Sequence, residues 1–244
     1  MERKMDKVIE TLILLARPAA GKSEIIKYLS IQNPETREKK FHVGNLCIID
    51  DFPMLWTWFE EDAILTDLGY TRLHTTDDGY FLKNYLWDVL IKRINLEFIK
   101  YQRDSSTDEP ATVIIEFSRG KEHGGYKRAF QYLSDDVLRK SAILHVNVSW
   151  EESLRKNKDR FNPNRPDSIL EHMLPDEKLK KLYYVSDWQE LTKGSSNYLN
   201  VRNSRIPYIN FENEDDVTTT IGNELGNRLE KVLNELWTSY VNNS

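Results

Sequence analysis

The chain has 244 residues, of which 39% are hydrophobic and 30% charged, a balance typical of a single globular domain spanning residues 1–244. Its formal net charge of −5 argues against a surface built to coat nucleic acid. No apolar run approaches the roughly 18 residues that a membrane span requires, and no signal-peptide core follows the charged N-terminus. We therefore expect a cytoplasmic protein with neither a nucleic-acid nor a membrane partner.

The first predicted strand and helix enclose a glycine-bearing loop. Residues 8–15 are largely apolar, as expected for a strand covered on both faces of a parallel sheet, and apolar residues recur at helical spacing over 25–29. The loop between them follows the phosphate-loop pattern G-x-x-x-x-G-K-[ST], except that Ala16 replaces the first glycine. We predict that a nucleotide's phosphates bind here. The predicted binding residues are Arg17, Pro18, Ala19, Ala20, Gly21, Lys22 and Ser23.

The chemistry of this loop follows from its position before a helix. A helix that begins near Lys22 directs its free N–H groups and the positive end of its dipole toward the loop. Lys22 supplies an ammonium group for phosphates, and Ser23 supplies a hydroxyl for Mg²⁺. The alternative is a chance G-K-S in a turn. If the position of Ala16 requires a positive φ, its Cβ costs on the order of 1 kcal/mol.

A second short strand, residues 46–49, ends directly before Asp50 and Asp51. Residues just past the C-terminal end of a parallel strand lie in the ligand crevice, so either carboxylate can take a proton from a substrate hydroxyl or help to hold Mg²⁺. The alternative is a simple helix cap. We expect a helical substrate-binding region over residues 52–103, in which Trp56 either stacks on a ring-shaped substrate or belongs to the core.

The next predicted strand, residues 111–117, carries an acid near its end. Glu116 there matches the Walker-B arrangement, in which a carboxylate reaches the Mg²⁺ beside the phosphate loop. An ordinary strand-end charge is the alternative. Arg119 follows in a glycine-bearing loop on the same side of the sheet, where we expect it to contact substrate or phosphate.

A basic segment follows the fourth predicted strand, residues 142–148. A capping box at 149–152 predicts the start of a helix that carries Arg155 and Arg160. A proline-bearing loop with Arg165 follows this helix. This segment, about residues 155–175, suits a lid that closes over transferring phosphates and excludes water. The alternative is a solvated charged face. We expect a helix over 175–191, a loop over 193–203, a last strand over 206–211 and a closing helix over 218–240.

The order of these parts, together with the segment from Arg17 to Ser23, resembles the adenylate-kinase-like and nucleoside-kinase-like group of P-loop small-molecule kinases. The resemblance implies a three-layer α/β fold of the P-loop NTPase type. Its parallel five-stranded sheet would have the order 2-3-1-4-5, with helices on both faces and a small lid. It also implies that Lys22 and Ser23 bind ATP and Mg²⁺, that Asp50 or Asp51 serves the acceptor, and that the lid arginines stabilise the moving phosphoryl group.

The expected activity is an ATP-dependent phosphotransferase that moves the γ-phosphoryl group to a small-molecule acceptor, for which we expect a nucleoside or nucleotide. One alternative is a regulatory or non-catalytic nucleotide-binding protein, to which Ala16 points. Another is a GTPase-type switch, which would need the guanine-recognition motif N-K-x-D. The most similar segment, residues 157–160, has its acidic residue one position too early. A homodimer stays open as an assembly.

Overall fold

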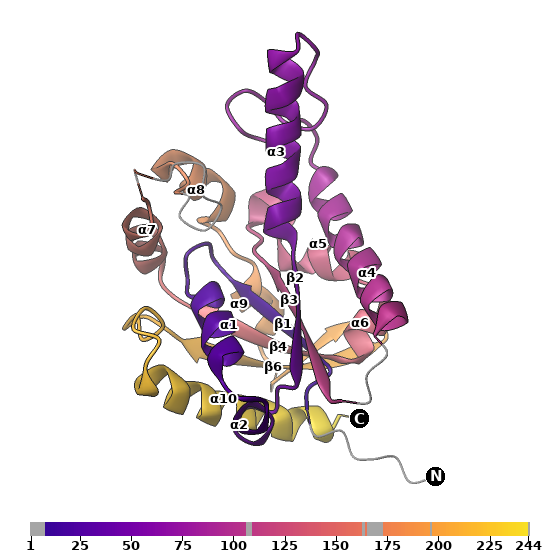
Figure 1. The fold of residues 1–244 in the computed structure, drawn as a ribbon, viewed down its shortest axis with the longest axis vertical. Helices are drawn as coiled ribbons and strands as arrows, with labels where there is room; N and C mark the ends of the chain where they lie inside the picture. Colours follow the sequence, from indigo (N-terminus) through magenta and orange to yellow (C-terminus); the bar gives the residue numbers. More distant parts are fainter. Residues whose placement is uncertain (1–7, 106–108, 163, 165–172, 196, 244) are drawn as a thin grey trace.

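The computed structural model describes residues 8–105, 109–162, 164, 173–195 and 197–243. Strands and helices alternate along most of the chain (Figure 1). In order they are β1 (Thr11–Ala16), α1 (Lys22–Ile31), α2 (Pro34–Phe41), β2 (Asn45–Asp50), α3 (Asp51–Asp67), α4 (Leu86–Asp104), β3 (Ala111–Phe117), the 3₁₀ helix η1 (Lys121–His123), α5 (Gly125–Tyr132), α6 (Asp135–Arg139), β4 (Ser141–Asn147), α7 (Trp150–Asp159), α8 (Asp176–Tyr183), α9 (Trp188–Thr192), β5 (Tyr198–Val201), β6 (Ser204–Glu212) and α10 (Asn223–Val241).

The sheet is mostly parallel and has six strands in the order β2-β3-β1-β4-β6-β5. The predicted five-stranded sheet with order 2-3-1-4-5 is therefore wrong in strand count and in sheet order. The unpredicted strand is β5, which pairs antiparallel with β6 at the edge. It lies where the polar composition predicted a loop. Leu199 and Val201 alternate into the core, and a turn in which Arg202 has a φ of 51° connects β5 to β6.

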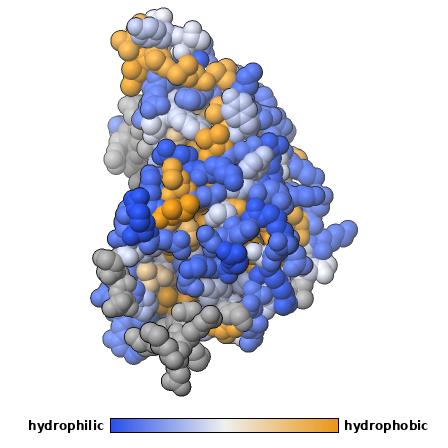
Figure 2. Space-filling model, turned by 90° about the vertical axis from the view of Figure 1, so that its right-hand side faces the viewer, coloured by the Kyte–Doolittle hydropathy of each residue, from blue (hydrophilic) through white to orange (hydrophobic). Residues whose placement is uncertain are grey.

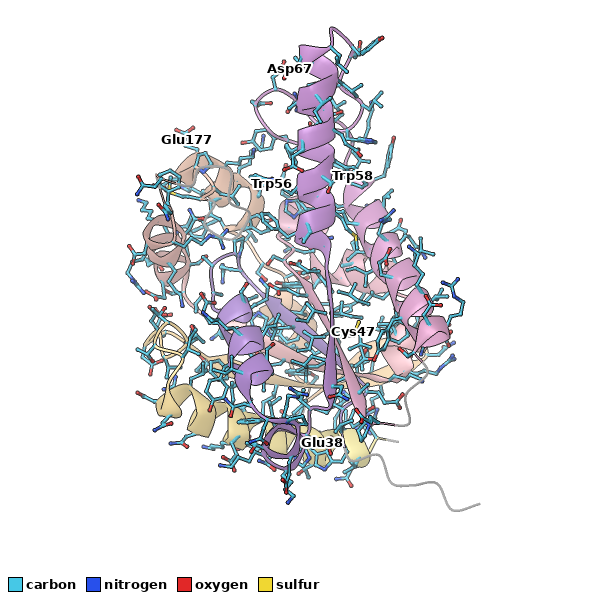
Figure 3. All side chains as sticks on the ribbon, in the orientation of Figure 1. Glu38, Cys47, Trp56, Trp58, Asp67 and Glu177 are labelled. Carbon is cyan, nitrogen blue, oxygen red and sulfur yellow. The ribbon has the colours of Figure 1, made fainter. Side chains whose placement is uncertain are left out.

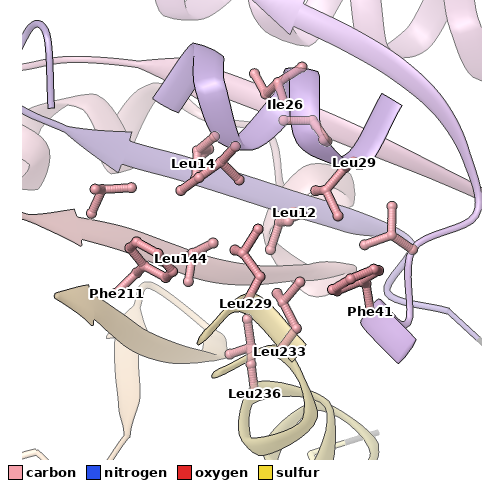
Figure 4. Close-up of a cluster of buried hydrophobic side chains, with 14 of the residues drawn as sticks. Leu12, Leu14, Ile26, Leu29, Phe41, Leu144, Phe211, Leu229, Leu233 and Leu236 are labelled. Atoms are coloured by element: carbon pink, nitrogen blue, oxygen red, sulfur yellow. The ribbon is translucent and has the colours of Figure 1, made fainter. Parts of the chain in front are cut away.

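Helices cover both faces of the sheet because consecutive residues of the central strand β1 point to opposite sides. Leu12 and Leu14 belong to a core shared with α1 and α10, part of which is drawn in Figure 4. Ile13 and Leu15 belong to a second core shared with α4, α5 and α6. Burial of both faces explains why the strand reads as one apolar run rather than as an alternating pattern.

The helices differ from the sequence predictions at several places. The expected helical region over 52–103 is interrupted between α3 and α4, and α6 was not predicted. The predicted connection after α1 contains α2, which Asn33 caps by accepting a hydrogen bond from the Thr36 N–H at 2.8 Å, with Pro34 at the first position. The predicted helix over 175–191 is divided into α8 and α9. The closing helix begins at Asn223 instead of residue 218.

Helix α3 projects away from the C-terminal end of β2, and the chain returns to the sheet along α4 (Figure 1). The loop between them, residues 68–85, is anchored on the buried carboxylate of Asp62. That carboxylate accepts hydrogen bonds from the N–H groups of Leu73, His74 and Thr75 at 2.5–2.9 Å and from the Thr75 hydroxyl at 2.7 Å. Burial raises the pKa of Asp62, but these four bonds together lower it to about 2.

The outer end of this projection carries exposed apolar side chains. Ile64, Leu68 and Leu73 are all more than half exposed, and hydrophobic side chains gather at this end of the molecule in Figure 2. Within the part of the chain that the structure describes, no helix combines the length and apolarity needed to cross a lipid bilayer.

Candidate functional site

A cleft of about 680 Å³ lies at the C-terminal ends of β1, β2 and β3, and we call it the strand-end cleft. Its walls come from the segment between β1 and α1, the residues after β2 and β3, the C-terminal half of α7 and the segment after β6. Such a crevice at the carboxyl edge of a parallel sheet is where ligands bind in open α/β proteins. Of the predicted site residues, the cleft brings together Pro18, Ala19, Ala20, Gly21, Lys22, Ser23, Asp50, Asp51, Glu116, Arg119, Arg155 and Arg160.

The Gly-Lys-Ser loop, residues 16–23, leaves β1 without backbone strain at its first residue. Among its residues the positive φ angles belong to Ala19 (58°) and Gly21 (110°), and Ala16 is not among them. The cost of a positive φ that was considered for Ala16 therefore does not apply to that residue. Ala19 has a positive φ instead, at a cost of about 1 kcal/mol. The Ala16 carbonyl accepts a hydrogen bond from the Tyr126 hydroxyl at 3.0 Å, which ties the start of the loop to α5.

Gly21 is required by both its backbone angle and its surroundings. A Cβ at this position would lie 2.5 Å from the Thr218 Oγ1 and 2.8 Å from the Asn213 Nδ2. The Asn213 amide also donates to the Ala20 carbonyl at 2.9 Å. The segment that follows β6 therefore packs directly behind the loop and supports it.

The loop ends at an open helix N-terminus. Helix α1 begins at Lys22, with Gly21 at the N-cap and no side-chain cap. Within the described residues, the N–H groups of Gly21, Lys22 and Ser23 have no hydrogen-bond acceptor. These groups and the positive end of the helix dipole favour an anion at this end of the cleft.

Lys22 is held inside the cleft instead of extending into solvent. Its side chain is buried, and its Nζ donates to the Ser118 Oγ at 2.8 Å and lies 3.7 Å from the Glu116 Oε1. Both partners come from the end of β3 and the residue after it. The ammonium group is therefore positioned between the Gly-Lys-Ser loop and the strand-end carboxylates.

Two of those carboxylates lie side by side because of the sheet register. Asp50 of β2 is the parallel partner of Glu116 of β3. Burial and the charge of Glu116 raise the pKa of Asp50 to about 7. Burial also raises the pKa of Glu116, while Lys22 lowers it. Asp50 also caps α3, because its carboxylate accepts a hydrogen bond from the Phe52 N–H at 2.9 Å. The two alternatives predicted for this residue, a helix cap and a cleft residue, therefore both apply.

Asp51 and Arg119 form a buried ion pair. The Arg119 Nη2 lies 2.6 Å from the Asp51 Oδ2, and both residues are at least 95% buried. The contact lacks the alignment of a hydrogen bond, and that oxygen has no other donor among the described residues. The Arg119 guanidinium also lies 5.0 Å from the centre of the Trp87 ring. Arg119 is thus part of the cleft wall, with its charge already balanced.

The two lid arginines of α7 and its end differ in their surroundings. Arg155 is half exposed and forms ion pairs with Glu152, Asp159 and Asp216. Arg160 is partly buried in the strand-end cleft, where burial lowers its pKa and the charges of Glu24 and Glu116 oppose that shift. The charge of Arg160 therefore acts on acidic residues from both α1 and the end of β3.

Arg17, predicted to bind phosphate, does not line the strand-end cleft. The Arg17 guanidinium donates to the carbonyls of Val148 (3.3 Å) and Tyr184 (3.1 Å), so this side chain connects the loop to the chain near α7 and α8. Arg165, predicted to bind substrate, lies outside the described residues.

The segment after β6 contributes site residues that were not predicted from the sequence. Asp216 pairs with the buried Lys156, which also donates to the Thr218 hydroxyl at 3.0 Å. Asp216 and Thr219 both line the strand-end cleft. The rule that identified Asp50, namely that residues past a parallel strand's C-terminal end line the crevice, applies equally to β6 and would have found them.

A second hollow, which we call the aromatic pocket, adjoins the cleft and has a volume of about 330 Å³. It lies between α3, the loop before α4 and α8. It shares five lining residues with the cleft: Phe52, Leu55, Trp87, Leu174 and Tyr183. Trp56 lines this pocket, on the side of α3 that faces α8 in Figure 3. Trp58 instead stacks on His74 at 5.2 Å and helps to hold the loop.

The predicted Mg²⁺ residues can supply only part of a coordination shell. Ser23 is exposed at the loop, and Glu116 lies at the end of β3. Within the described residues, no group of three or more His, Cys, Asp or Glu side chains is arranged to hold a metal ion. Their oxygen atoms are nevertheless of the type that Mg²⁺ prefers, and such sites are usually completed by phosphate oxygens and water.

In comparisons with known proteins, no protein-family model and no curated protein matches this chain. What the protein binds is therefore inferred from the geometry of its two adjoining hollows.

Proposed function

We propose that the protein is an ATP-dependent phosphotransferase that moves the γ-phosphoryl group to a hydroxyl of a small molecule. One observation carries this proposal. An open helix N-terminus, a buried lysine and two adjacent carboxylates with raised pKa values all line the strand-end cleft, and the lysine Nζ lies 3.7 Å from one of these carboxylates. A phosphate donor bound at the helix N-terminus would therefore lie in the same cleft as a proton acceptor, as phosphoryl transfer requires.

On the donor side, the phosphates of ATP would bind the N–H groups of Gly21, Lys22 and Ser23. The Lys22 ammonium would neutralise phosphate charge without needing to move, because Ser118 and Glu116 already hold it. Mg²⁺, bound through Ser23, Glu116 and phosphate oxygens, would supply further neutralising charge. The positions of these groups before binding reduce the reorganisation that the reaction needs.

On the acceptor side, Asp50 is the proposed base. A carboxyl whose pKa is raised to about 7 is a better proton acceptor at neutral pH than an ordinary aspartate. The acceptor O–H gives its proton to the Asp50 carboxylate. The oxygen of the acceptor then forms a bond to the γ-phosphorus. The bond between that phosphorus and the bridging oxygen breaks at the same time, and ADP leaves.

The buried ion pair favours a hydroxyl acceptor over a phosphate acceptor. An acceptor phosphate needs an uncompensated cation, but the Arg119 charge is balanced by Asp51 at 2.6 Å. Asp51 and Arg119 therefore shape and position this part of the cleft. Arg160, which also lines the cleft, is the proposed stabiliser of the moving phosphoryl group, with Arg155 available after it exchanges its present carboxylate partners.

The two alternatives have less support. The non-catalytic alternative relied on strain at Ala16, and that residue has no positive φ. The GTPase alternative needs Asn157 to read a base. The Asn157 side chain is fully buried, donates to the Leu174 carbonyl at 2.8 Å and accepts the Leu174 N–H at 3.2 Å.

The experiment is a coupled assay of ADP release with MgATP and a panel of hydroxyl-bearing acceptors, including nucleosides, sugars and aromatic alcohols. We expect at least one acceptor to stimulate ADP release in the unmodified protein and not in Lys22→Met. Lys39→Met, on the exposed surface of α2, serves as the matched control. Protein that binds ATP but shows no acceptor-stimulated ADP release would contradict the proposed function.

A further inference from the structure

The walls of the aromatic pocket are built mainly from flat rings. Trp56 and Phe59 come from α3, Tyr80 and Phe81 come from the loop before α4, and Trp87 comes from the start of α4. The ring centres of Phe59 and Phe81 lie 5.9 Å apart, and those of Phe81 and Trp87 lie 4.7 Å apart. The rings that form the walls therefore pack against one another. A volume of about 330 Å³ between such walls suits a planar ligand of one or two rings.

Two lysines on α8 add positive charge to this apolar site. The Nζ atoms of Lys178 and Lys181 lie 4.8 Å and 4.2 Å from the centre of the Tyr80 ring. Lys178 donates to the Asp78 carbonyl at 3.2 Å. Within the described residues, neither lysine has a carboxylate at ion-pair distance, although several other lysines of the chain do.

The charge balance of the lining is positive. Among the described lining residues, Lys178 and Lys181 face one acidic residue, Glu122. The exposed Asp78 lies outside the lining, and a hydrogen bond from Thr76 and the charges of both lysines lower the pKa of its carboxyl. His123, which also lines the pocket, stacks on Trp87 at 3.8 Å and is held neutral, because burial lowers its pKa to about 2. An anion placed between the two lysines would gain two charge-assisted contacts in a partly desolvated site.

We propose that the aromatic pocket binds a planar ring compound that bears an anionic group, with the ring between the aromatic walls and the anion between Lys178 and Lys181. The pocket shares Phe52, Trp87 and Tyr183 with the strand-end cleft, so the opposite end of such a compound lies toward Asp50 and Asp51. Only the assignment of this compound as the phosphoryl acceptor rests on the proposed function. The binding site itself does not.

The test compares two probes of the same shape, 2-naphthoate and its neutral isostere 2-naphthamide, by isothermal titration calorimetry without nucleotide. We expect 2-naphthoate to bind the unmodified protein about tenfold more tightly, since it alone can pair with the lysines. The double variant K178M/K181M is expected to bind both probes equally, with unchanged affinity for 2-naphthamide. Lys180→Met on the same helix is the matched control, because the Lys180 Nζ lies over Tyr184 outside the pocket.

Three results would overturn the inference: no binding of either probe, equal affinities in the unmodified protein, or an anion preference that survives in K178M/K181M. A repeat titration with saturating MgATP locates the anion, because displacement of 2-naphthoate by MgATP would place it on the Gly-Lys-Ser loop and contradict the proposal. The titration measures no turnover. Selective binding in a protein that fails the ADP-release assay would thus support this site while rejecting the kinase.

Discussion

The strand-end cleft and the aromatic pocket adjoin each other but are built in different ways. The cleft lies at the C-terminal ends of parallel strands, and the sheet register places Asp50, the last residue of β2, beside Glu116 of β3. The pocket is formed by helices and a loop that project from the sheet, and its walls depend on the anchoring of residues 68–85 to Asp62. The charged groups of the cleft are therefore fixed by the sheet, while the walls of the pocket are fixed by contacts between helices and a loop that lie outside it.

The largest effect is expected from the cleft. Lys22→Met removes the only cation that contacts both Ser118 and Glu116 among the described residues, and it leaves the raised-pKa carboxylates without their neighbouring charge. We expect acceptor-dependent ADP release to fall by about a hundredfold or more, the scale of a lost electrostatic contact to the transition state. Turnover within a few-fold of the unmodified protein would show that the cleft is not where transfer occurs.

A second change in the cleft separates catalysis from stability. If Asp50 must be deprotonated to act as the base, kcat/KM of the unmodified protein rises with pH through about 7. Asp50→Asn should lower kcat by about a hundredfold and abolish that rise. A pH–rate profile with the same shape in Asp50→Asn would contradict the assignment of the base.

The same variant gives a stability prediction of the opposite sign. The pKa of Asp50 is raised from 3.8 to about 7 in the folded state, so its protonation stabilises the fold, and that contribution is lost as the pH rises through about 7. Asparagine caps helices as well as aspartate does. Asp50→Asn should therefore have a higher Tm than the unmodified protein at pH 8 and a similar Tm at pH 4, as measured by thermal unfolding.

In the aromatic pocket, the corresponding change is Asp62→Ala. It removes four hydrogen bonds to the loop, and we expect the free energy of unfolding to fall by about 2 kcal/mol, with several-fold weaker binding of 2-naphthamide. Asp67→Ala, at the exposed end of the same helix, is the control for chemical denaturation. Unchanged probe binding in Asp62→Ala would show that the pocket does not depend on this anchor.

The smallest effects concern Ala16 and Ala19, two of the three alanines of the Gly-Lys-Ser loop. Ala19→Gly should raise the free energy of unfolding by at most about 1 kcal/mol, because it relieves a positive φ while adding chain entropy to the unfolded state. Ala16→Gly should leave turnover unchanged, because Ala16 has no positive φ. An activity that appears only in Ala16→Gly would instead favour the non-catalytic alternative.

The difference between the two regions also explains what the sequence could predict. Strand β1, the start of α1 at Lys22 and the carboxylates after β2 are encoded within a few neighbouring residues, and the structure places them together. Helix α2 had an equally local signal, the Asn33-Pro34 cap, which the polar composition of the segment obscured.

Long-range contacts account for the remaining misses. Strand β5 exists because β6 offers it an edge, and its four residues carry little pattern of their own. The hydrogen bonds from residues 73–75 to Asp62 span 11 to 13 positions, so no periodicity reveals them. The helical pattern likewise cannot tell that Trp56 faces a pocket while Trp58 holds a loop, because that depends on where α8 packs.

The central claim, phosphoryl transfer within the strand-end cleft, is tested most directly by ³¹P NMR of the protein with MgATP and the acceptor panel. We predict that a new phosphomonoester resonance grows together with the ADP signals in the unmodified protein, and that it is absent in Lys22→Met. ATP that binds but remains unchanged, or that yields only ADP and inorganic phosphate with every acceptor, would contradict the account.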